Sequence, residues 1–134
     1  MSLGVVIVAG VVITVATVKH GDDAVSNDPG CKEYSSQLTG FLTTPPTGYT
    51  DYEDYAKYYG AYYFPAAYAV DHAQNDQVTR AMIALRDASQ AVESDATKDE
   101  VVGGGTPVSQ STLQADISTF DGDRAAVDQI CALN

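Results

Sequence analysis

Basic side chains are scarce in this sequence. Its 134 residues include 7 Lys and Arg against 18 Asp and Glu, which gives a formal net charge of −11 at pH 7. Sequence-independent binding to nucleic acid depends on clustered Lys and Arg that neutralise phosphates. The composition therefore argues against a nucleic-acid partner, and a basic soluble partner suits the chain better.

Histidine is also rare, with two residues. Only His72 lies in the body of the chain, too little for a catalytic triad or a His-based metal site. Haem ligation by His72 and Met82 fails on distance, because their spacing corresponds to about 15 Å along one helix. Residues 121–123 match only a fragment of a calcium loop, and the glycines at 103–105 lack the Lys-Ser/Thr of a phosphate loop. We expect no catalytic residue, no metal and no cofactor, hence a protein that is not an enzyme.

The longest apolar stretch runs from Leu3 to Val18, carries no charge and ends at Lys19. As a helix, residues 1–18 span about 27 Å, just short of the roughly 30 Å hydrocarbon core, and Lys19 can snorkel to cover the difference. We predict a transmembrane helix over residues 1–20 and a turn-rich linker over residues 21–30. A cleaved secretory signal and a buried strand are the alternatives. The first lacks a basic start, and the second would be unusually long.

Small residues recur along one side of this predicted helix. Gly10, Thr14 and Thr17 follow at spacings of four and three, which places them on a narrow face where a second helix can come close. The spacing predicts a membrane partner that packs on these three residues. The alternative is a face without a partner, since Gly and Thr are ordinary in membrane helices.

The body beyond residue 30 shows 3.6-residue periodicity, and no segment there has the period-two alternation of a half-buried strand. A first helix is expected after Asp28 as N-cap, with Pro29 at its first position. Thr50 and Glu53 have the spacing of a capping box that opens a second helix, which Pro65 kinks or ends.

Two further helices are expected, each with an inward apolar stripe. The stripe of the third consists of Val78, Met82, Leu85, Ala88 and Val92. The fourth begins with Pro107 at its first position and contains Gly122, which costs about 1 kcal/mol relative to Ala. Its inward residues are Leu113, Ile117, Phe120, Val127 and Ile130. The expected fold is all-α: a single N-terminal transmembrane helix followed by a small, disulfide-clipped four-helix bundle over residues 31–134.

The two cysteines fall near the start of the first bundle helix and the end of the last. In an up-and-down bundle these ends lie at the same pole, so we predict a disulfide between Cys31 and Cys131. Such a bond indicates an oxidising compartment and places the body outside the cytoplasmic membrane. Two unpaired thiols or metal ligands are the alternatives, and Lys19 on the C-terminal flank weakly favours a cytoplasmic body.

All nine tyrosines lie between residues 34 and 68. On a helix, Tyr52, Tyr55, Tyr59 and Tyr62 share one face at spacings of 3, 4 and 3. One interpretation is a surface that contacts a partner or lipid headgroups, because Tyr is enriched at interfaces. The other is core packing, because this helix has few Leu and Ile.

The body is acidic, rich in Ala, Val and Asp, and has a predicted disulfide that joins its two ends. In this general composition it is similar to envelope proteins of high-GC Gram-positive bacteria. We expect a non-catalytic, single-span accessory subunit of a larger bacterial membrane protein complex, with a respiratory supercomplex as one plausible host. Its partners are integral membrane proteins and the lipid bilayer. The alternative is a pilin-like structural subunit of a surface filament. An apolar helix that continues into a globular body resembles pilin-like proteins, although Val5 stands where those commonly have Glu.

Overall fold

Helices are the regular elements of the structure. The computed structural model describes residues 25–38, 44–97 and 108–133, and no strand occurs in these ranges. Their helices are α3 (Pro29–Gln37), α4 (Tyr52–Gly60), α5 (Tyr63–His72), α6 (Asp76–Thr97) and α7 (Gln110–Ile130). The expectation of an all-α body is confirmed for this part of the chain.

The predicted transmembrane helix over residues 1–20 lies outside the described residues, and so do Gly10, Thr14 and Thr17. Among the helices that are described, none is long and apolar enough to cross a bilayer. Part of the predicted linker over residues 21–30 is described, and it already belongs to the body, because α3 begins at Pro29.

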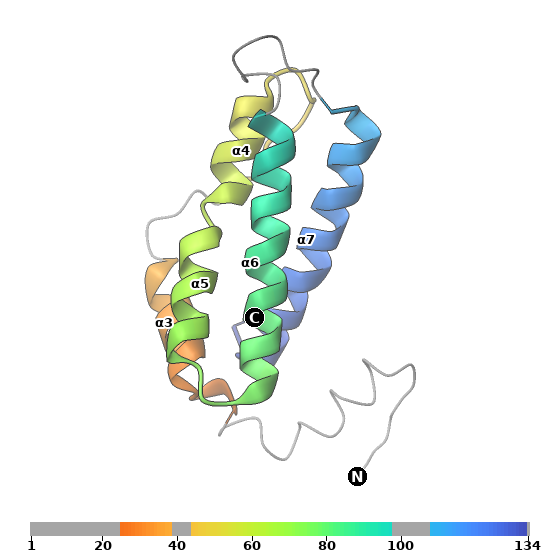
Figure 1. The fold of residues 1–134 in the computed structure, drawn as a ribbon. Coiled ribbons are helices and arrows are strands. Elements are labelled where there is room, and N and C mark those ends of the chain that lie inside the picture. The colour runs from red at the N-terminus through yellow and green to blue at the C-terminus, as the bar shows by residue number, and fades with distance from the viewer. Residues whose placement is uncertain (1–24, 39–43, 98–107, 134) are drawn as a thin grey trace, which may run out of the picture.

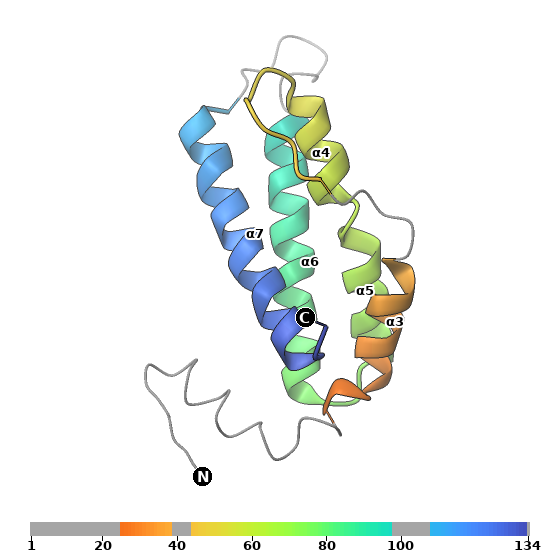
Figure 2. The same cartoon turned by 180° about the vertical axis from the view of Figure 1, so that it is seen from behind.

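The helices form an antiparallel bundle of four rods (Figure 1). One rod consists of α4 and α5, which follow each other end to end, and α6 packs along both of them. On one side α3 packs against α5, and on the other side α7 packs against α6, as the view from behind also shows (Figure 2). The expected four-helix bundle is therefore present, with its second rod divided.

Pro65 explains where the second rod is divided. A proline ring clashes with the carbonyl of the residue four positions earlier, here Ala61. The chain leaves helical order after Gly60 and resumes it at Tyr63, so Pro65 occupies the first turn of α5, where its missing N–H has no helical partner to lose. The prediction that Pro65 interrupts the helix is confirmed, and the break lies just before the proline.

Two helix starts differ from the prediction. The cap of α4 is Asp51, whose side chain accepts a 3.0 Å hydrogen bond from the Glu53 N–H, so the capping box at Thr50 was wrong by one residue. Helix α7 begins at Gln110 after Ser109, whose hydroxyl accepts a hydrogen bond from the Thr112 N–H. The prediction that it begins at Pro107 was therefore wrong. In both places several cap-forming residues compete, and sequence spacing does not rank them.

The apolar stripe predicted for α6 is confirmed, since all five of its residues are buried. In α7 the residues Leu113, Phe120 and Val127 are fully buried. Ile117 and Ile130 are only partly buried and pack against the edge of the core. The core thus lies between α6 and its neighbours on both sides.

Candidate functional site

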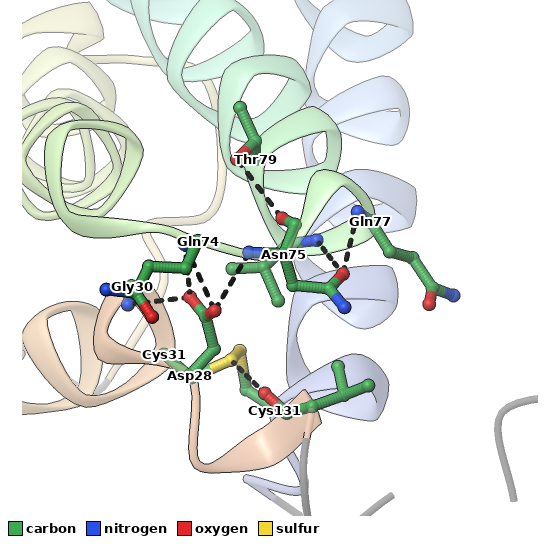
Figure 3. Close-up of a disulfide and its surroundings, with 10 residues drawn as sticks. Asp28, Gly30, Cys31, Gln74, Asn75, Gln77, Thr79 and Cys131 are labelled. Atoms are coloured by element: carbon green, nitrogen blue, oxygen red, sulfur yellow. Dashed lines mark hydrogen bonds between the residues drawn. A yellow bond between two sulfur atoms is a disulfide. The ribbon is translucent and has the colours of Figure 1, made fainter. Parts of the chain in front are cut away.

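The predicted disulfide is confirmed. Cys31 in α3 and Cys131 at the end of α7 are bonded, with their Cα atoms 5.4 Å apart across a sequence separation of 100 residues (Figure 3). Both residues are almost completely buried, at 2% and 4% exposure. We call the end of the bundle that holds this bond the disulfide pole. The first described residue, Val25, lies at the same pole, because its carbonyl oxygen is 3.7 Å from the Cys31 Sγ. The start of the described ribbon can be followed at this end of the bundle (Figure 1).

A buried carboxylate ties the same pole together without a covalent bond. Asp28 caps α3 by accepting a 2.9 Å hydrogen bond from the Gly30 N–H. The carboxylate also accepts hydrogen bonds from the backbone N–H groups of Gln74 and Asn75 in the turn between α5 and α6 (Figure 3). Carboxylates bind N–H groups more strongly than neutral acceptors do. One side chain therefore fixes the α5–α6 turn against the start of α3.

The α5–α6 turn in turn organises the start of α6. The Asn75 side-chain oxygen accepts hydrogen bonds from the N–H groups of Gln77 at 2.8 Å and Val78 at 3.3 Å (Figure 3). Asn75 thus acts as the cap of α6 while its own backbone N–H binds Asp28. Three helix ends depend on this short chain of hydrogen bonds.

Helices α3 and α5 approach so closely at Gly30 that only glycine fits there. A Cβ atom at this position would lie 2.8 Å from the Ala73 Cβ and 2.9 Å from the Ala69 carbonyl oxygen. The close approach brings Asp28 within reach of the α5–α6 turn. This contact is a further requirement of the disulfide pole that helical periodicity did not reveal.

The four tyrosines proposed as a contact face are mostly core residues. Tyr55, Tyr59 and Tyr62 are 2%, 5% and 4% exposed, whereas Tyr52 is half-buried. The rings of Tyr59 and Tyr62 pack edge-on against Phe120 of α7, with centroids 4.9 and 5.0 Å from it. The contact-face interpretation therefore does not apply to these three residues, which supply the bulk that Leu and Ile would otherwise give.

Burial changes the acidity of these phenols. It raises the pKa of Tyr59 to about 12, with the nearby Asp121 carboxylate adding to the effect. Burial also raises the pKa of Tyr62 to about 12, although the Arg124 guanidinium, 5.2 Å above its ring, opposes the shift. The raised pKa values keep Tyr59 and Tyr62 neutral, which suits packing rather than proton transfer.

The exposed aromatic surface lies one element further along the chain. Phe64 is 61% exposed and Tyr68 is 44% exposed, both on the outer face of α5. Tyr63 is half-buried and packs edge-on against Phe64, with ring centroids 5.4 Å apart. We call Tyr63, Phe64 and Tyr68 the α5 aromatic patch. The spacing of four between Phe64 and Tyr68 could have indicated it, had the helix been counted from the break onward.

The ionisable side chains form no recognisable catalytic arrangement in the described body. His72 is exposed, and its Nδ1 lies 2.8 Å from the Tyr68 carbonyl oxygen, whereas Met82 is fully buried in the core. No group of three or more His, Cys, Asp or Glu in the described ranges could hold a metal ion. Comparisons of the chain with protein-family models, curated proteins and solved structures found no match. Function is therefore inferred from the chain's own residues.

Proposed function

We propose that this protein is a non-catalytic, single-span accessory subunit of a larger bacterial membrane protein complex. Residues 1–20 anchor it in the cytoplasmic membrane, and the acidic helical body docks on the outer face of its host. A respiratory supercomplex is one plausible host. Integral membrane proteins and the surrounding lipid are its partners.

The disulfide pole is the observation that carries this proposal. A buried Cys31–Cys131 bond is typical of proteins that fold in an oxidising compartment, which supports a body outside the cytoplasmic membrane. The described body begins at this same pole, where the Val25 carbonyl oxygen is 3.7 Å from the Cys31 Sγ, and the proposed anchor precedes Val25 in the sequence. A force exerted by a membrane anchor would act on the disulfide pole. This pole is held together both by the Cys31–Cys131 bond and by the Asp28 hydrogen bonds.

The body itself has the features of an attachment module. Its core is filled by neutral phenols and apolar side chains, and its exposed large hydrophobic residues are Phe64, Tyr68 and Leu133 in the described ranges. A net charge of −11 favours contact with basic surfaces and disfavours contact with acidic ones. These features support binding to another protein without chemistry at the interface.

Purification of the full chain from its native membrane in a mild detergent tests the proposal. We expect larger membrane proteins to co-purify at fixed stoichiometry, as identified by mass spectrometry. The variant Gly10→Leu/Thr14→Leu should lose these proteins while staying in the membrane fraction, because bulky side chains block close helix packing. The matched control is Val12→Leu, which leaves Gly10 and Thr14 intact. Recovery of the chain in shearable fibres would instead support the pilin-like alternative.

A further inference from the structure

The α5 aromatic patch is the most exposed apolar surface in the described part of the chain. Phe64 and Tyr68 are one helical turn apart, and their ring centroids are 6.1 Å from each other. Toward the core, α5 buries Pro65, Ala66 and Ala69, so the two rings face away from the bundle. Large side chains exposed as a group mark a contact surface more often than single exposed residues do.

The patch lies near the point where the chain enters the body. Helix α5 ends at His72, next to the turn that Asp28 binds. Along the helix axis, Tyr68 is about 6 Å and Phe64 about 12 Å from that end. The six residues 19–24 between the uncharged stretch and the described body reach about 20 Å when extended. A body on such a short connection keeps α5 within reach of the bilayer surface.

Charged side chains are absent from the stretch of α5 that carries the rings. From Tyr63 to Val70, α5 has no Asp, Glu, Lys or Arg, and the exposed Asp71 follows toward the disulfide pole. The neighbouring α3 carries Lys32 and Glu33, whereas the carboxylates of α7 lie on the far side of α6 from α5 (Figures 1 and 2). The rings therefore lie in an uncharged stretch of the acidic body.

We propose that the α5 aromatic patch seats in the headgroup region of the bilayer that holds the anchor, so that α5 lies along the membrane surface. This inference rests on the membrane anchor of the proposed function. Aromatic rings prefer the membrane–water boundary, and the stretch from Tyr63 to Val70 brings no carboxylate of its own to the lipid. Because the anchor keeps the patch at a high local concentration near the bilayer, a few rings are enough to keep the body bound to the membrane surface.

The absence of tryptophan makes this arrangement measurable, since one introduced Trp is the single indole in the chain. The full-length Phe64→Trp variant is placed in phosphatidylcholine nanodiscs, with and without brominated acyl chains. Its matched control is Ala125→Trp, which is exposed on α7 and lies about 9 Å along the helix axis from Cys131. Acrylamide, which is uncharged, reports access from water despite the acidity of the protein.

We expect the Trp at position 64 to emit at a shorter wavelength in the nanodisc-bound chain than in a reference variant. The reference variant lacks residues 2–18 and is measured in buffer without detergent. In nanodiscs the Trp at position 64 should also be quenched by brominated lipid and protected from acrylamide, while the Trp at position 125 shows none of these changes. Equal acrylamide quenching at both positions, without quenching by brominated lipid, would overturn the lipid contact. Protection that arises only when a host protein is added would overturn it too. Failure of the chain to co-elute with nanodiscs would refute the anchor itself, which is a separate result.

Discussion

The carboxylate of Asp28 accepts a 2.9 Å hydrogen bond from the backbone N–H of Asn75, which follows it by 47 positions in the chain. The side chain of Asn75 then caps α6, and Asp28 itself caps α3. The caps of α3 and α6 are thereby linked through the Asp28 carboxylate. Because Cys31 lies in the same turn of α3, the covalent and hydrogen-bonded links of the disulfide pole support each other.

The caps Asp28 and Asp51 offer a direct comparison. Asp28→Ala should lower the free energy of unfolding by about 2–3 kcal/mol, because a cap is lost and the N–H groups of Gln74 and Asn75 lose their acceptor. Asp51→Ala should cost about 0.5–1 kcal/mol, because Asp51 is exposed and caps α4 alone. Urea unfolding with the disulfide intact measures both values. Equal losses for the two variants would contradict the central role given to Asp28.

Reduction of the disulfide should strongly destabilise the body. The bond closes a loop of 100 residues, for which the chain-entropy relation gives about 4.7 kcal/mol. That amount approaches the whole stability of a small domain, so the reduced protein should unfold at a much lower denaturant concentration. The double variant Cys31→Ser/Cys131→Ser is the control, and its unfolding should not respond to reductant. A wild-type protein that unfolds at the same denaturant concentration with and without reductant would refute this prediction.

Two glycines should respond to alanine in opposite directions. Gly122 in α7 has open space around the position of a Cβ, so Gly122→Ala should stabilise the body by about 0.5–1 kcal/mol. Gly30→Ala should destabilise it by about 1–3 kcal/mol, because the added methyl group overlaps Ala73. Thermal unfolding followed by circular dichroism gives both shifts. A stabilising Gly30→Ala would show that α3 and α5 are further apart than described.

The buried phenols predict a loss of stability in alkali. A tyrosine whose folded pKa is about 12 keeps its proton in the folded state after the unfolded chain, with a pKa near 10, has lost it. The contribution of these two tyrosines to stability is therefore constant below about pH 10 and falls as the pH rises toward 12. Ultraviolet absorbance of the phenolates should show a late titration phase, which Tyr59→Phe reduces. If Tyr59→Phe instead reduced the early phase, Tyr59 would not be buried.

Sequence reasoning succeeded where one element determines the outcome. The apolar stripe of α6 can be predicted from the helical repeat alone. The pairing of Cys31 with Cys131 can be predicted from the alternating direction of the four rods. Sequence reasoning left alternatives open where two elements decide together. The regular spacing from Tyr52 to Tyr62 allowed a contact face or core packing, and core packing applies to Tyr59 and Tyr62 because Phe120 of α7 covers them.

The Asp28 contacts could not have been predicted for a related reason. An Asp before a Pro indicates a helix cap, and this part was correct. The bonds to Gln74 and Asn75 depend on how closely α3 and α5 approach at Gly30, which is a property of the packed bundle. The exposure of Phe64 likewise depends on which side of α5 the other helices cover.

The location of the two cysteines tests the whole account most directly. Intact cells are treated with a membrane-impermeant thiol reagent before and after reduction with a membrane-impermeant reductant. We predict no labelling of Cys31 or Cys131 before reduction and labelling of both after it. Free thiols on both residues that react only after cell lysis would contradict a disulfide-closed body outside the cytoplasmic membrane.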